Sequence, residues 1–251
     1  MKLTILGNSG AYPCADGACS GYLLTDNGTG ILLDCGTGVV ANLQKHLSIQ
    51  KLSHIIISHI HADHFLDLIP LRYALFRLKS LGIIHRPVIH LPPGGAPQLL
   101  SAVSFLENPD FFSEYFHVEE YNPAEGLNIS GIDFKFAPVP HYVPSWAISA
   151  KKGGKLTFSS DCAPGDTLVD LAAGSDIFLC EALLEKNDDD GSPRGHMTME
   201  EAAAIARKAA VKHLLVSHFW PDSDYSHQLA AAKKIFPGKL EMAELNRSYS
   251  V

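Results

Sequence analysis

The sequence predicts a layered α/β fold in a single domain. Three apolar segments that resemble strands, at 134–140, 156–160 and 213–217, each end beside one histidine or aspartate, as expected where loops at strand ends form an active site. Residues 66–80 carry a broad apolar face, which predicts a helix packed on a sheet. No low-complexity block or long polar linker divides the 251 residues, so one domain over 1–251 is expected.

The N-terminal region begins with strands and tight turns. Residues 2–6 are predicted to form a strand, and the small residues 7–10 after it are interpreted as a plain turn rather than a phosphate-binding loop. Segments 21–25 and 30–34 are expected to pair as a hairpin around an Asn-Gly turn. Asp34 closes the second of these strands, where its carboxylate can either hold the turn or orient a metal ligand.

Histidine and aspartate are concentrated in segment 58–64, Ser-His-Ile-His-Ala-Asp-His. An isoleucine run before it predicts a buried strand and an apolar segment after it predicts a helix, so the cluster lies on a strand-to-helix turn. Such a turn can point His59 and His61 one way and Asp63 and His64 another. The spacing therefore suits two adjacent metal ions, and these donors favour zinc, with manganese or iron as alternatives. A His-rich surface loop without a metal is the competing interpretation.

The second half of the chain adds single candidates at strand ends. The three strand-like segments lead to His141, Asp161 and His218. A further histidine, His196, precedes Thr198, which forms a capping-box pattern with the glutamate three residues later. A helix is therefore predicted to start at Thr198, with His196 just outside it.

Several other features favour structural roles. Without a companion at ligand spacing, the histidines at 85, 90 and 117 are expected to be structural. The aromatic residues Phe111, Phe112, Tyr115 and Phe116 are expected to form core or a hydrophobic rim rather than to border a substrate pocket. The acidic run 188–190 is expected to be a solvated loop.

The composition indicates which binding partners and which cellular compartment to expect. The 20 Lys and Arg against 27 Asp and Glu give a formal net charge of -7, which does not favour RNA or another long nucleic acid as a partner. Five scattered cysteines without a CxxC pair favour a reducing compartment. The N-terminus begins like a strand rather than a signal peptide, and no apolar run approaches transmembrane length. We expect a soluble cytoplasmic protein without membrane contact, with a small-molecule or nucleotide substrate, and compatible with a homodimer.

The ordered candidates resemble the five motifs of the metallo-β-lactamase superfamily across nearly the whole chain. The motifs are Asp34, the H-x-H-x-D-H segment 59–64, His141, Asp161 and His218. The ribonuclease Z-like branch is most similar, on the segments His-Tyr-Val-Pro at 141–144, Cys-Glu-Ala at 180–182, Gly-His-Met-Thr at 195–198 and Ser-His-Phe at 217–219.

This resemblance implies an αββα sandwich of two mixed sheets flanked by helices. It also implies the roles of the site residues. One zinc would be held by His59, His61 and His141, and the other by Asp63, His64 and His218, with Asp161 bridging both. His196 matches the histidine of the branch's H-x-T motif, which assists the phosphate or the leaving group.

Two departures from the ribonuclease Z pattern concern transfer RNA. The segment between Asp161 and His196 is short and has the acidic run 188–190 at its tip, where that branch has a long basic arm. Residues 7–13 also do not continue into the branch's Arg-Asn pair. Docking of transfer RNA is therefore not favoured, although the metal ligands are complete.

The function expected from these residues is that of a dinuclear zinc-dependent hydrolase that cleaves through a metal-activated hydroxide. Asp63 would orient the hydroxide and accept its proton, and His196 would stabilise charge on the phosphate or protonate the leaving group. The leading hypothesis is a phosphodiesterase for a small or nucleotide-like phosphodiester. The alternatives are a tRNA 3′-end endoribonuclease of the ribonuclease Z type, a carboxylic ester, thioester or lactone hydrolase with the same metal centre, and a non-enzymatic zinc-binding protein.

Overall fold

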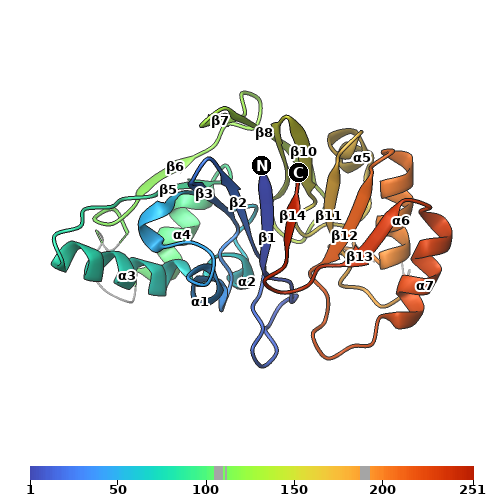
Figure 1. Ribbon diagram of the computed structural model, residues 1–251, viewed down its shortest axis with the longest axis horizontal. Coiled ribbons are helices and arrows are strands. Elements are labelled where there is room, and N and C mark those ends of the chain that lie inside the picture. Colours follow the sequence, from blue (N-terminus) through green and yellow to red (C-terminus); the bar gives the residue numbers. More distant parts are fainter. Residues whose placement is uncertain (105–109, 111, 187–192) are drawn as a thin grey trace.

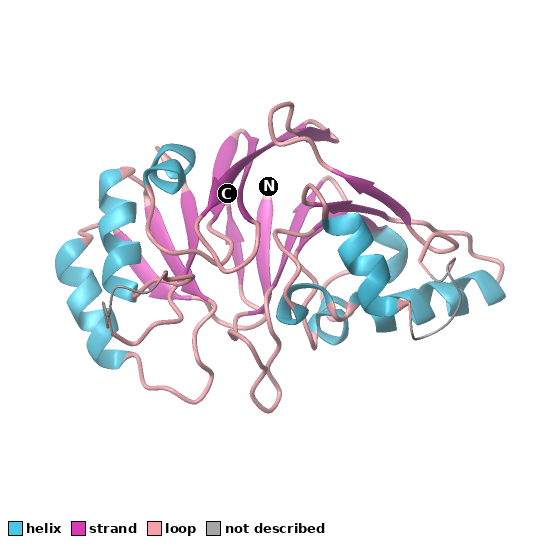
Figure 2. Cartoon of the chain, turned by 180° about the vertical axis from the view of Figure 1, so that it is seen from behind, coloured by secondary structure: helices cyan, strands magenta, loops and turns pink. Residues whose placement is uncertain are grey.

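The chain forms two β-sheets packed face to face with helices on both outer sides. The computed structural model describes residues 1–104, 110, 112–186 and 193–251. In Figure 1 the sheets occupy the centre, with α1 to α4 on one side and α5 to α7 on the other, and Figure 2 shows the same layers from behind. The predicted αββα sandwich is confirmed.

The first sheet has seven strands and is built mainly from the N-terminal half. Its order is β14 (Ser248–Ser250), β1 (Lys2–Gly7), β2 (Gly21–Asp26), β3 (Thr29–Leu33), β4 (Leu52–Ile56), β5 (Val88–Leu91) and β6 (His117–Glu120). Strands β14 to β3 pair antiparallel and β3 to β6 pair parallel. The last strand of the chain therefore returns to the first sheet, beside β1.

The second sheet also has seven strands and is mixed in the same way. Its order is β13 (Lys239–Met242), β12 (His213–Ser217), β11 (Ile177–Glu181), β10 (Gly154–Phe158), β9 (Ser145–Lys152), β8 (Ile132–Val139) and β7 (Leu127–Ile129). Strands β10 to β13 are parallel, and β7 to β10 are antiparallel. Parallel strands place their carboxyl ends at one edge, which is where the candidate site residues follow.

The helices cover the outer faces of the two sheets. The first sheet carries α1 (Val39–Leu43), the 3₁₀ helix η1 (Ile49–Lys51), α2 (Ala62–Phe65), α3 (Leu68–Ser80) and α4 (Gly95–Val103). The second carries α5 (Asp166–Ala172), α6 (Met199–Lys208) and α7 (Ser226–Ile235). None of the described helices is both long enough and apolar enough to cross a membrane.

Three hydrophobic clusters correspond to the three interfaces between these four layers. The central cluster lies between the sheets and contains Tyr22, Phe134 and Phe158, all buried. A second cluster packs α1 to α4 on the first sheet, and a third packs α5 to α7 on the second. Alternation along each strand explains the layering, because successive side chains point to opposite faces.

The local predictions hold with small changes at the boundaries. The hairpin 21–25 with 30–34 is present as β2 and β3, and its turn residues Asn27 and Gly28 both have positive φ, which fits an Asn-Gly turn. The predicted helix 66–80 is present as α3 but begins at Leu68, because a separate turn of helix, α2, precedes it.

The aromatic residues Phe112, Tyr115 and Phe116 are buried in the core, as expected. Phe111 and the acidic run 188–190 lie outside the described residues.

Candidate metal centre

The candidate ligands meet at the edge of the sandwich where the carboxyl ends of several strands lie. His59 to His64 follow β4 and run into α2, whose residue before the first turn is His61. His141 lies in the turn between β8 and β9. Asp161 follows β10 and His218 follows β12, so both sheets contribute to one site. The structure thus brings together all seven residues proposed as ligands.

These residues form two donor sets that share one carboxylate. The first contains His59, His61, His141 and Asp161, the second contains Asp63, His64, Asp161 and His218, and within each set the donor atoms lie within 4.8 Å of one another. In the first set, His61 Nδ1 lies 3.1 Å from His59 Nε2 and 3.0 Å from His141 Nε2. In the second, Asp161 Oδ2 lies 3.2 Å from His64 Nε2 and 3.1 Å from His218 Nε2.

The chemistry of these donors fits a pair of divalent cations. Burial, the largest cause, lowers the pKa of His141 to about 4, so its imidazole is neutral at pH 7 and offers a lone pair. Asp161 Oδ1 is buried and has no hydrogen-bond partner in the described part of the chain, which fits an oxygen that binds a metal ion. Imidazole nitrogens and carboxylate oxygens in this mixture suit zinc, manganese or iron. Which metal binds, and through which ligands, stays a prediction.

Asp34 both holds the turn and orients a ligand, so both of the roles considered for it are present. Its side chain is fully buried. One carboxylate oxygen accepts the backbone N–H of Ser58 at 2.7 Å, and the other accepts the Ser58 hydroxyl at 2.8 Å and His64 Nδ1 at 2.7 Å. Donation from His64 Nδ1 leaves the lone pair on Nε2, which faces Asp161 and the predicted metal.

Other neighbours fix the remaining imidazoles in the same manner. His141 Nδ1 donates to the carbonyl of Gly195 at 2.6 Å, and His218 Nδ1 lies 2.9 Å from the Ser20 hydroxyl. His218 itself has a positive φ of 50°, a conformation uncommon for a residue other than glycine, directly after β12. Both rings therefore present Nε2 to the site.

The loop after β1 packs against this site and does more than turn the chain. The backbone N–H of Ala11 donates to Asp63 Oδ2 at 2.9 Å. At Gly10, a Cβ atom would lie 2.4 Å from a Leu183 methyl carbon and 3.1 Å from the His218 ring. Glycine is needed there because the backbone lies directly against the ligand shell.

His196 lies beside both donor sets and belongs to neither. Its ring centroid is 4.9 Å from that of His141 and 5.8 Å from that of His218. Nδ1 lies 2.9 Å from Glu181 Oε1. Burial, the largest single cause, disfavours the charged form, but the carboxylates of Glu181 and Asp161 together raise the pKa of His196. The capping box predicted after it is present, with Thr198 as the N-cap of α6 and Glu201 as its partner.

Glu181 is the functional residue whose role the motifs alone did not assign. It is fully buried at the end of β11, and besides His196 it accepts the backbone N–H groups of Cys162 at 2.6 Å and Leu183 at 3.2 Å. The sequence pattern that could have identified it is the one that identified Asp161 and His218, namely an apolar strand followed by one titratable residue. These bonds make Glu181 a rigid support for the His196 ring.

The histidines expected to be structural lie away from this site. His85 Nε2 donates to the carbonyl of Leu52 at 2.7 Å, and His90 lies between His54 and Glu119 in the first sheet. His117 is exposed on β6. None of the three belongs to a donor set among the residues that the structure describes.

The comparisons with known proteins agree with this geometry. A family model described as a β-lactamase superfamily domain matches residues 29–219. An uncharacterised protein of Mycobacterium tuberculosis is 30% identical, over 100% of this chain and 92% of the relative.

Three named proteins are similar to this chain over nearly its full length. YhfI of Bacillus subtilis, named as a probable metallo-hydrolase, is 27% identical over 97% of each chain. Its crystal structure aligns with a TM-score of 0.89 at 25% identity, over 99% of this chain and 98% of that chain. Ribonuclease Z of Ignicoccus hospitalis is 26% identical over 98% of this chain and 97% of the relative. The short form of human tRNase Z aligns with a TM-score of 0.76 at 25% identity, over 100% and 99% of the two chains.

The fold, the two donor sets and these similarities support a metal-dependent hydrolase. The matched segment 29–219 contains all seven candidate ligands and His196. The chain belongs to the β-lactamase superfamily.

Proposed function

We propose that this protein is a dinuclear zinc-dependent phosphodiesterase of the ribonuclease Z-like branch, acting on a small or nucleotide-like phosphodiester. The observation that carries the proposal is the position of His196, whose imidazole Nδ1 lies 2.9 Å from buried Glu181 and whose ring lies beside both donor sets. Hydrolysis of a carboxylic ester, thioester or lactone needs such an imidazole less than hydrolysis of a phosphodiester, in which an alkoxide leaves the phosphorus atom.

The donor sets would hold two divalent ions, with His59, His61 and His141 on one, Asp63, His64 and His218 on the other, and Asp161 on both. When bound, such a pair lowers the pKa of water, polarises the phosphoryl oxygen and aligns the substrate. Asp63 is positioned by the Ala11 N–H and is partly accessible to solvent, so it can orient the attacking water and accept its proton.

His196 would act on the phosphoryl group or on the leaving alkoxide rather than on the attacking water. Its Nδ1–H is taken by Glu181, so Nε2 is the nitrogen that can face a substrate. The Glu181 carboxylate raises the pKa of His196, which favours a proton on both ring nitrogens. An Nε2–H donor can stabilise negative charge on the phosphoryl group or protonate the departing alkoxide.

Exposed aromatic rings near the site support a substrate with a planar group. Tyr142 is 64% exposed, and its ring centroid lies 5.8 Å from that of His196. Tyr12 follows Ala11, which contacts Asp63, and its ring lies 6.1 Å from that of Trp220. Such faces stack well on a nucleobase. We therefore favour a nucleotide-like phosphodiester over an unsubstituted one.

The similarity to ribonuclease Z supports a second candidate, tRNA 3′-end endonucleolytic cleavage by the same residues. Against it stand the short segment between Asp161 and His196 and the net charge of -7. Hydrolysis of a carboxylic ester, thioester or lactone is the third use of such a centre.

Measurements of metal content and turnover on one purified sample distinguish these three activities. Metal content should be measured together with turnover of bis(p-nitrophenyl) phosphate, cyclic nucleotides, a precursor tRNA, and a panel of thioesters and lactones. We expect zinc in the protein and turnover of the small phosphodiesters. Turnover of the acyl substrates alone would exclude the phosphodiesterase, and efficient cleavage of the precursor tRNA would establish the second candidate instead.

A further inference from the structure

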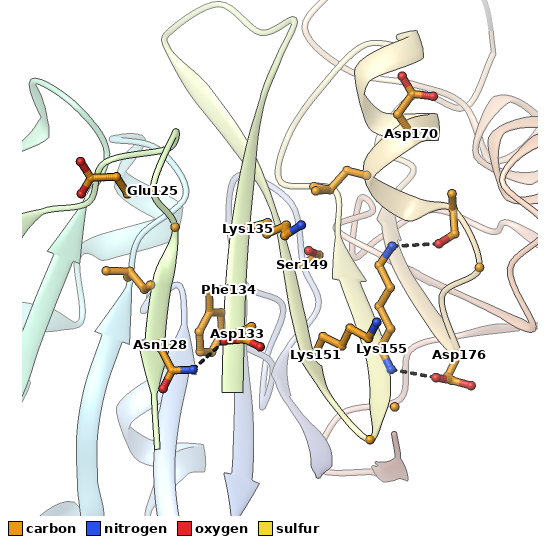
Figure 3. Close-up of a pocket in the computed structure, with 17 residues that line it drawn as sticks. Glu125, Asn128, Asp133, Phe134, Lys135, Ser149, Lys151, Lys155, Asp170 and Asp176 are labelled. Carbon is orange, nitrogen blue, oxygen red and sulfur yellow. Dashed lines mark hydrogen bonds between the residues drawn. The ribbon is translucent and has the colours of Figure 1, made fainter. Parts of the chain in front are cut away.

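A groove on the outer face of the second sheet is separate from the metal centre. It has a volume of about 790 Å³ and lies over β7 to β10 beside α5 (Figure 3). None of the residues that line it belongs to either donor set. Lys155 lies near the start of β10 and Asp161 follows its end, and the three residues from Lys155 to Phe158 alone span roughly 10 Å of extended strand.

Three lysines enter this groove from three adjacent strands. Lys135 lies on β8, Lys151 on β9 and Lys155 on β10, each on the face opposite the central core. The register places Lys151 directly opposite Lys155. Like charges at such a position are destabilising. Consistent with this, burial and then the charges of Lys151 and Lys135 lower the pKa of Lys155.

The donors in the groove are largely unused. Lys155 Nζ donates to the carbonyl of Ala173 at 2.8 Å, which leaves two of its N–H groups. Among the described residues, neither Lys135 nor Lys151 forms a side-chain hydrogen bond or ion pair. Ser149 lies on the groove floor opposite Lys135, is only 4% exposed, and its hydroxyl likewise has no partner in that part of the chain. The Ser149 oxygen is not one of the fully buried side-chain atoms that lack a partner, so it is open to water or a ligand in the groove.

Carboxylates surround these donors and limit the size of an anion that could bind. Asp133 accepts from Asn128 at 2.6 Å, and Asp176 is paired with Lys212 at 2.6 Å, so both are already engaged. Glu125 and Asp170 lie at the margins of the groove in Figure 3, away from the lysines. An extended polyanion would have to cross this acidic rim, whereas a compact anion would contact only the central donors.

We propose that Lys135, Ser149, Lys151 and Lys155 bind the phosphoryl group of a small phosphorylated molecule. Lysine ammonium groups bind phosphate as point charges, and the serine hydroxyl adds a directed hydrogen bond. The groove volume is that of a site for a small molecule rather than a macromolecule. The anion would also relieve the repulsion between Lys151 and Lys155.

Lysine acetylation of the metal-loaded protein, read by peptide mass spectrometry, tests the location of binding. AMP and inorganic phosphate are the probes, and adenosine is the matched control without a phosphoryl group. At about four times its Kd, a probe should slow acetylation of Lys135 and Lys151 about fivefold by mass action, with no change at Lys233 and Lys234 on α7. Protection by AMP and phosphate alike assigns a phosphoryl site, and protection by AMP alone assigns a nucleotide site.

Calorimetric titration with AMP tests the residues. We expect Lys151→Gln and Ser149→Ala each to weaken binding about tenfold, because each removes a donor to the anion. Lys233→Gln removes the same charge from a distant surface and should leave the Kd unchanged. Equal acetylation with and without the probes, protection by adenosine, or equal weakening by Lys151→Gln and Lys233→Gln would overturn the proposal.

Discussion

The substitution His196→Ala gives the sharpest test of the proposed chemistry. His196 belongs to neither donor set, so its removal should leave two metal ions per chain in place. A positioned acid or base contributes about 10²- to 10⁴-fold to rate, and kcat for a cyclic nucleotide, whose leaving alkoxide needs a proton, is expected to fall by that factor. KM should change little, because the group acts mainly as charge develops in the transition state.

The stability cost of this substitution can also be worked out from the contacts. Glu181 loses a charged partner at 2.9 Å but keeps the backbone donors of Cys162 and Leu183. A hydrogen bond to a charged group contributes about 2 kcal/mol, which corresponds to roughly 4–8 °C in Tm for a chain of this length. The variant should therefore still fold, and its metal content and kcat can be compared with those of the wild type.

Glu181→Gln is a companion variant, since it keeps an oxygen acceptor for His196 and removes the charge that raises its pKa, while its amide NH2 replaces the oxygen that accepts from Leu183. Its kcat should lie between the values for the wild type and His196→Ala, again with full metal content. The reasoning is refuted if His196→Ala loses metal and activity in parallel, or if it retains a wild-type kcat. Metal analysis by mass spectrometry and steady-state kinetics on the same samples separate these outcomes.

Four further predictions address ligands, specificity and stability. Asp161→Asn should reduce bound metal from two ions per chain toward zero and abolish turnover, because this residue belongs to both donor sets; metal analysis that still finds two ions would contradict the shared role. Tyr142→Ala should raise KM for an adenine-containing phosphodiester about tenfold with kcat nearly unchanged, since stacking on one base contributes about 1–3 kcal/mol; an unchanged KM would remove the ring from the substrate site. Thr198→Ala should lower the free energy of unfolding by about 1 kcal/mol in urea titrations, because it removes the N-cap of α6. Burial lowers the pKa of His90 to about 4 in the folded protein, against about 6.5 in the unfolded chain. The neutral imidazole therefore stabilises the fold fully above about pH 6.5, and this contribution is lost as the pH falls from there toward about 4. In metal-free protein, His90→Gln should flatten the pH dependence of Tm over that interval.

Local sequence patterns predicted much of the fold and most of the candidate site. The hairpin turn at 27–28 and the cap at Thr198 depend on neighbouring residues, so they could be read directly. The candidate metal ligands were detectable because donor side chains at strand ends are costly to bury without an ion or a partner. The two-sheet sandwich was implied by the family resemblance rather than by residue patterns, and the strand order was not predicted, since pairing joins segments far apart in the chain.

Tertiary structure decided the features that depend on such distant segments. The return of β14 to the first sheet, the bond from Ala11 to Asp63 and the support of His196 by Glu181 each join residues that no local pattern relates. The lysine groove has the same origin, because three lysines on separate strands become a cluster only when β8, β9 and β10 pair in register. The amino-acid sequence specifies which donor side chains follow each strand, but the packing of the two sheets sets which groups those donors face. The reason is that hydrogen bonds and charges act over a few ångströms in space, whatever the separation along the chain.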